Sequence, residues 1–166
     1  MADLPTDCMT PEKPPFMFVE VDCFGLFIVR KGRSLVKRYW VLFTCLSIRA
    51  IHLEVTHSLD TDSFVNAMWW FIVRRGQPKE VRSDNGGNFV RGERELCEAI
   101  ERWNQHKNGE FLLQQNVRWT FNPPGGSQHG GIWERCIRTV KKVMCTLTKE
   151  QILDDEGLAA LLCEVE

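Results

Sequence analysis

Three acidic residues occupy positions where an acidic side chain needs an explanation. Asp22 interrupts a run of apolar and aromatic residues. Asp84 lies where an expected strand runs into Asn85-Gly86-Gly87, and Glu134 falls in the first turn of the longest expected helix. Strands are depleted in Asp, and a buried carboxylate is costly unless a distant base or a metal ion meets it. Three convergent carboxylates without Cys or His partners suit a hard cation such as Mg²⁺ or Mn²⁺.

Each of these acids also has an ordinary structural explanation. Asp22 equally fits a structural Asp whose charge is satisfied within the fold. Asp84 fits an Asx turn, and Glu134 fits a solvated residue that complements the positive end of a helix dipole. Singly, none of them identifies a function, so the question is whether the fold brings the three together.

The hydrophobic pattern predicts three adjacent strands followed by alternating helices and strands. Aromatic and β-branched residues fill the first strands, and Gly32 lies among charged residues between two of them, as in a hairpin. The expected strands are 16–29, 39–47, 50–55, 80–83 and 116–121, and the expected helices are 61–75, 93–105 and 132–151. This order predicts an α/β domain, a mixed sheet with helices packed against it.

The length and composition are those of one globular domain. The chain has 166 residues, of which 43% are hydrophobic and 26% charged, and its six Trp and ten Phe argue against disorder. Residues 1–15 hold four of the seven prolines and predict an extended arm, so the core is expected over 16–166. An apolar helical face begins at Leu158 and stops at Glu166, which predicts a core truncated at its C-terminus.

Charge and cysteine usage narrow the class of protein. Because 21 Lys and Arg balance 22 Asp and Glu, the net charge does not indicate a nucleic-acid or membrane partner, although bases concentrate between Arg30 and Arg49. Seven Cys without a Cys-x-x-Cys pair argue against a disulfide framework or a zinc finger and favour a reducing compartment. The longest apolar run, 67–73, is too short for a membrane span, so we expect a soluble, intracellular protein without a membrane partner.

Together with their neighbours, the three acids form an ordered motif. Asp22, the segment Ser83-Asp84-Asn85-Gly86-Gly87-Asn88-Phe89, and Phe121-Asn122-Pro123 leading to Gly131-Ile132-Trp133-Glu134-Arg135 resemble the Asp, Asp, Glu signature of retroviral and retrotransposon integrase catalytic cores. The likeness is closest to the BEL/Pao-type retrotransposon group, which carries stretches similar to 37–46 and 129–135. It runs from about Ala2 to the last residue, and a three-part ordered match is far more specific than one short motif.

The sequence also departs from that family in three places. Asp84 and Glu134 are further apart than is typical of retroviral integrases, and a longer helix near 93–109 is expected to absorb the difference. The sequence has no match to the family's zinc-binding His/Cys module or to a DNA-binding domain after the core. The pair Trp69-Trp70 stands where relatives often carry bases.

The resemblance implies a fold and a mechanism. The fold is ribonuclease H-like, a mixed five-stranded sheet flanked by helices, in which the first strand, the end of the fourth strand and a helix bring the acids together. Two Mg²⁺ or Mn²⁺ ions are implied, with Asp22 binding both, Asp84 one and Glu134 the other. The implied activity is that of a polynucleotidyl transferase, an integrase that cleaves DNA phosphodiesters and joins a 3′-hydroxyl to target DNA.

The long helix predicts residues that hold DNA. Arg138 and Lys141 lie within roughly 60° of Glu134 on one helical stripe, and basic residues beside a metal site are suited to phosphates. The alternative is a solvated face with i, i+4 ion pairs. A different stripe is expected to face the core, namely Cys136, Val140, Val143 and Leu147. With Arg138 and Lys141, the expected DNA-binding residues are Asn85, Gln128 and His129.

Partners and rival functions follow from the same resemblance. The expected partners are retroelement ends, target DNA and a second copy of the chain. The second copy is expected to bind through Trp69 or Trp70, which lie on either side of Val73. Alternatively, both indoles pack within their own chain. The expected location is the nucleus, and the alternative is a cytoplasmic particle before nuclear entry. The rival functions are a ribonuclease H-like nuclease or transposase, and a catalytically silent DNA-binding or dimerisation module.

Overall fold

The computed structural model describes residues 13–83, 117–121, 133–150 and 152–165. Its elements in chain order are β1 (Phe18–Lys31), β2 (Ser34–Cys45), β3 (Ile51–Thr56), α1 (Thr61–Arg75), β4 (Glu80–Ser83), β5 (Arg118–Phe121), α3 (Trp133–Glu150) and α4 (Asp155–Val165). The helix expected over 93–105 lies outside the described residues. The other expected elements are present, with ends that differ by a few residues.

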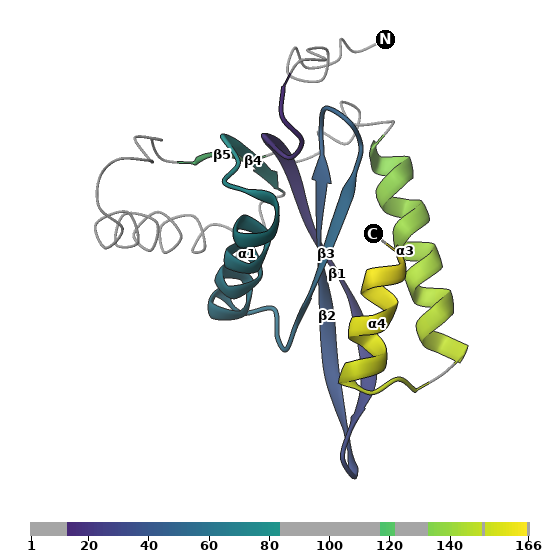
Figure 1. The fold of residues 1–166 in the computed structure, drawn as a ribbon. Helices are drawn as coiled ribbons and strands as arrows, with labels where there is room; N and C mark the ends of the chain where they lie inside the picture. The colour runs from purple at the N-terminus through teal and green to yellow at the C-terminus, as the bar shows by residue number, and fades with distance from the viewer. Residues whose placement is uncertain (1–12, 84–116, 122–132, 151, 166) are drawn as a thin grey trace.

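The five strands form one mixed sheet in the order β3-β2-β1-β4-β5. β1 and β2 pair antiparallel, as do β2 and β3, whereas β4 is parallel to both β1 and β5. A strand that returns parallel needs a crossover, and α1 supplies the one between β3 and β4. The sheet therefore has the mixed five-stranded architecture that the sequence predicts, with β1 at its centre (Figure 1).

The β1–β2 hairpin is longer than the sequence pattern indicates. Lys31 pairs with Ser34, so only Gly32 and Arg33 form the turn, and Gly32 has φ +60°. A two-residue turn with a glycine at positive φ matches the right-handed twist of the strands on either side. The polar residues around the turn therefore continue the ladder to its tip, although apolar alternation has stopped. The bases Arg30, Lys31 and Arg33 are exposed there.

Helix α1 begins and ends at strong local signals. The Asp60 side chain accepts a hydrogen bond from the Ser63 amide at 2.8 Å, and Gly76, at φ 92°, ends the helix. Hydrogen bonds from the Ser58 hydroxyl and the Ser63 amide lower the pKa of Asp60 below its usual value, because they favour the carboxylate. Phe64, Met68 and Phe71 are buried as the helical spacing predicts, although Trp69 is also partly covered.

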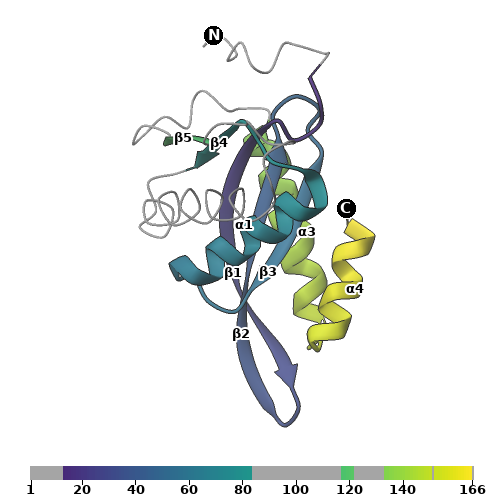
Figure 2. The same cartoon turned by 60° about the vertical axis from the view of Figure 1, so that its left-hand side comes forward.

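Two layers of helix enclose the sheet, with α1 on one face and α3 with α4 on the other (Figures 1 and 2). Side chains alternate along β2, so Val41 and Phe43 join the core under α1, whereas Trp40 and Leu42 join the core under α3 and α4. The rings of Phe43 and Phe71 stack at 4.3 Å between centroids, which anchors α1 to the sheet.

Helix α4 packs its apolar face on the second core. Leu158 is fully buried there, and Leu161 and Leu162 pack against the same cluster. The Asp154 side chain accepts from the Gly157 amide at 2.7 Å and caps the helix. The guanidinium of Arg38 on β2 donates twice to the Asp155 carboxylate, both at 3.1 Å, and this fork joins the helix to the sheet.

Replacing Asp155 by Ala is expected to lower the free energy of unfolding by about 1–2 kcal/mol, because the buried guanidinium of Arg38 loses its carboxylate. Glu156→Ala is the matched control: it removes an exposed acid from the same helical turn and should cost less than about 0.5 kcal/mol. Urea denaturation measures both variants. Equal losses would show that only the helix dipole senses Asp155.

Candidate active site

Asp22 lies at the centre of the sheet and points to the face that carries α3. It pairs with Leu42 on β2, and its neighbour Val21 is buried in the core under α1. Because successive side chains of a strand alternate between faces, Asp22 projects to the opposite side. Its side chain is 27% exposed, so it is partly buried but accessible to solvent.

The end of β4 lies next to the part of β1 that carries Asp22. The last residue of β4, Ser83, pairs with Val21, and its hydroxyl accepts a hydrogen bond from the Trp119 indole on β5 at 2.7 Å. The chain therefore leaves β4 next to the residue that precedes Asp22. Asp84 follows immediately in the sequence and lies outside the described residues, as do Asn85, Gln128 and His129.

Glu134 is the second residue of α3, the helix that packs across β1 and β2. Its side chain is not among those described. The sequence prediction that it lies in the first turn of a long helix is confirmed for the backbone, because α3 is the longest helix in the described part of the chain. Two turns later the same helix reaches Asp22 through Lys141. Arg138, one turn after Glu134, is exposed.

Lys141 forms an ion pair with Asp22. Its ammonium donates to Oδ2 of Asp22, and its Nζ lies 5.4 Å from the centroid of the Phe24 ring. Asp22 and Phe24 are two residues apart on β1 and therefore face the same way. The alternative that Lys141 belongs to a solvated helix face with i, i+4 ion pairs is wrong, because its side chain is only 35% exposed and lies against the sheet.

The orientation of α3 differs from the expected one. Val143 and Leu147, expected in the core, are 43% and 40% exposed, whereas Met144 is fully buried beside Val140. The helix is rotated so that the 140–144 row meets the sheet, which also brings Lys141 to its border. The alternation of apolar and polar residues did not separate Val143 from Met144, because both are apolar and a few tens of degrees decide which one packs.

Among the residues that the structure describes, no group of three or more His, Cys, Asp and Glu side chains could hold a metal ion. This part of the chain contains the side chain of only one of the three expected ligands, Asp22. That carboxylate nevertheless fits a cation, because it offers oxygen donors, borders solvent and already holds the ammonium of Lys141.

Sequence reasoning missed two polar contacts that depend on the tertiary structure. The Lys141–Asp22 pair joins residues 119 positions apart, and no local pattern signals it. His52 is fully buried, and its Nε2 lies 2.8 Å from the Glu54 carboxylate. Arg75 donates to its Nδ1 at 3.3 Å, so Nε2 carries the proton that Glu54 accepts.

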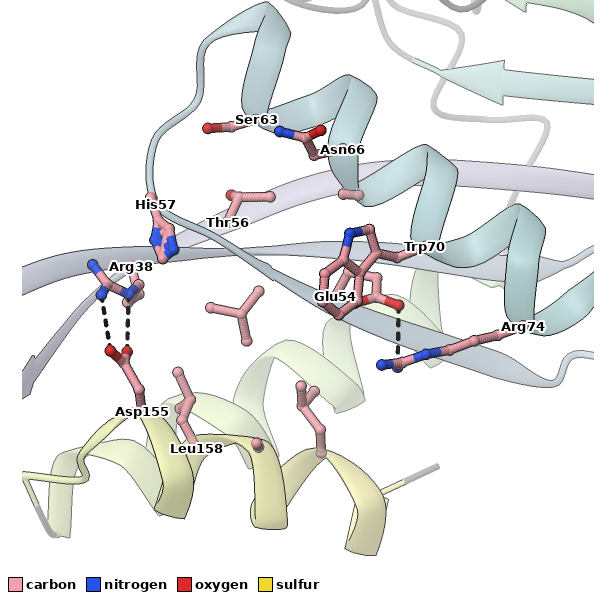
Figure 3. Close-up of a pocket in the computed structure, with 14 residues that line it drawn as sticks. Arg38, Glu54, Thr56, His57, Ser63, Asn66, Trp70, Arg74, Asp155 and Leu158 are labelled. Carbon is pink, nitrogen blue, oxygen red and sulfur yellow. Dashed lines mark hydrogen bonds and ion pairs between the residues drawn. The ribbon is translucent and has the colours of Figure 1, made fainter. Parts of the chain in front are cut away.

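A groove lies apart from this site, between β3, α1 and α4 (Figure 3). Its volume is about 680 Å³, and Trp70 lies along its wall. Two ion pairs border it: Arg38 with Asp155 at 3.1 Å, and Arg74 with Glu54 at 3.2 Å. Asp22 and Lys141 do not line the groove, so it is separate from the candidate active site.

Comparison with solved structures identifies the fold. The structure is similar to a chain of the simian T-cell lymphotropic virus intasome in complex with PP2A regulatory subunit B56 gamma, with a TM-score of 0.63 and 13% identity. The match covers 98% of this chain and 52% of the intasome chain. The fold is ribonuclease H-like. By the coverage of the match, this chain spans about half the length of the intasome chain.

A second, weaker likeness is to the HTLV-2 integrase catalytic core domain in complex with magnesium, in its dimeric form. Its TM-score is 0.46, with 12% identity over 69% of this chain and 66% of that chain. No family model matches the sequence, and no curated protein matches it either. No helix in the described ranges is long and apolar enough to cross a membrane.

Proposed function

We propose that this chain is an integrase catalytic core that cleaves and joins DNA phosphodiesters for a retroelement of the BEL/Pao type. The observation that carries the proposal is the position of Asp22 in an integrase-like fold. It follows Val21, whose partner Ser83 ends β4 directly before Asp84, and α3, the helix that carries Glu134, reaches it through Lys141. These two contacts support the proposal that the three acids share one site.

The residues have separate roles in this proposal. Asp22, Asp84 and Glu134 hold two Mg²⁺ or Mn²⁺ ions, which when bound activate a water or a DNA 3′-hydroxyl and stabilise the leaving oxygen of an in-line displacement. Arg138 is exposed on α3, where its guanidinium can bind a DNA phosphate. The proposal also assigns DNA contacts to Asn85, Gln128 and His129.

A branched DNA that mimics the strand-transfer product tests the activity. In the presence of Mn²⁺, the isolated chain should reverse strand transfer on this substrate but should not process linear ends sequence-specifically, because the proposal assigns none of its residues to reading a terminal sequence. DNA binding should be weak and should fall steeply with salt, because phosphate contacts release counterions.

The outcomes separate the rival functions. Cleavage without joining of 3′-hydroxyls would identify a nuclease. Efficient sequence-specific processing of linear ends by this chain alone would contradict the proposal that the core does not read the terminal sequence. DNA binding with no chemistry under any metal condition would identify a silent binding module.

We also propose that two copies associate through the outer face of α1. Trp70 is 57% exposed and Val73 79% exposed on that face, and an apolar patch of this kind is seldom left bare in a monomer. Trp69, the other expected contact, instead packs against the core of its own chain. The dimer therefore uses Trp70 and Val73, and the proposed site of action is the nucleus, where target DNA lies.

A further inference from the structure

The ammonium of Lys141 is bound to the Asp22 carboxylate, which the proposed function assigns to metal ions. It donates to Oδ2 of Asp22 and lies over the ring of Phe24. These two contacts come from neighbouring positions on one face of β1, so the Lys141 side chain is held across the site. The pair is partly exposed on both sides, with 35% of the Lys141 side chain and 27% of the Asp22 side chain accessible.

The ion pair and a bound divalent cation compete for the same oxygen. A divalent ion such as Mg²⁺ binds carboxylate oxygen at about 2.0–2.1 Å, and an ammonium on that oxygen would bring two cations into repulsive contact. Since the proposed function takes Asp22 as a ligand of the metal ions, Lys141 would have to leave Oδ2 when they bind. A partly exposed ion pair is weak enough to be displaced in this way.

We propose that Lys141 is a placeholder: it neutralises Asp22 while the site lacks metal, and divalent cations release it toward a DNA phosphate. The inference rests on the proposed function, because it takes Asp22 as a metal ligand. Metal binding and DNA binding are then coupled through one side chain. Thermodynamic reciprocity requires that DNA which captures Lys141 also tightens metal binding.

Mn²⁺ titration of the DNA-free chain tests this inference without relying on activity. Free Mn²⁺ is followed by electron paramagnetic resonance in the wild type, Lys141→Met and Lys142→Met. Lys142→Met is the matched control, because Lys142 is exposed and the substitution removes the same charge one residue later on the same helix. Lys141→Met should bind Mn²⁺ about threefold to fivefold tighter than the wild type, which corresponds to losing a partly exposed ion pair. Lys142→Met should change the affinity by less than about 1.5-fold.

A second measurement observes the release directly. In protein carrying ¹⁵N-labelled lysine, the Nζ signal that disappears in Lys141→Met is assigned to Lys141. Addition of Mg²⁺ should shift this signal toward that of a solvated lysine, and Asp22→Asn should produce the same shift without metal. A Lys141 signal that Mg²⁺ and Asp22→Asn leave unchanged would overturn the placeholder role.

The failure of this inference is distinguishable from the failure of the proposed function. If Mn²⁺ binding depends on Asp22 but is equal in the two lysine variants, or weaker in Lys141→Met, the metal site stands and the placeholder role is rejected. If the wild type binds no Mn²⁺, or Asp22→Asn binds it equally well, the metal site itself is rejected and the inference falls with it.

Discussion

Asp22→Asn is expected to abolish Mn²⁺-dependent phosphodiester chemistry, with a loss of about a thousandfold or more. The amide keeps the shape of the side chain but removes the charge that would hold the metal ions. When catalytic groups act together, removing one of them abolishes nearly all of the enzyme's activity. Asp84→Asn and Glu134→Gln should have the same effect if the three acids share one site. The measurement is reversal of strand transfer on branched DNA.

Stability without metal separates this catalytic loss from misfolding. Three crowded carboxylates alone would predict a gain in stability on removing one charge, but Asp22 is already paired with Lys141. Asp22→Asn should therefore lower the free energy of unfolding slightly, by less than about 1 kcal/mol, because the ion pair is partly exposed.

The control for the loss of charge is Asp62→Asn, which removes an exposed acid from the first turn of α1 and should leave the chemistry intact. Full activity in Asp22→Asn would reject the assignment. Unfolding of that variant at ordinary temperature would show that its lost activity reports structure.

Trp70→Lys is expected to convert a dimer into a monomer. Burial of a large aromatic side chain at the centre of an interface commonly contributes 2 kcal/mol or more, so dimer dissociation constants should rise about thirtyfold or more. Sedimentation velocity over a range of protein concentrations measures this change. The fold should survive, because the Trp70 side chain is 57% exposed and its described ring contact is with the exposed Arg74.

The choice of variant follows from the structure. Trp69 packs against the core, so replacing it by Lys would disturb the fold together with any interface. Leu35→Lys is the control: it places the same charge on an exposed apolar residue, 60% accessible, on the β1–β2 hairpin and should leave the dimer intact. A monomeric wild type, or a Trp70→Lys protein that remains dimeric, would refute the interface.

The sequence by itself determined the elements whose signals are local. Aromatic and β-branched residues in the first strands, a capping signal at Asp60 or Thr61 and a stop signal at Gly76 predict β1, β2, β3 and α1 near their observed positions. The turn at Gly32 fixes the hairpin, although the polar residues on either side hid how far its strands extend. Such signals act within a few residues, so sequence reasoning can detect them without knowing the fold.

The tertiary structure decided which face of each helix is covered and which charges meet. The rotation of α3 buries Met144 and exposes Val143, and it brings Lys141 to Asp22 across 119 residues of sequence. In α1, packing covers Trp69 and leaves Trp70 exposed, although the two are adjacent and identical in type. Such choices depend on how close-packed surfaces fit together over the whole domain, and periodicity alone carries no record of that fit.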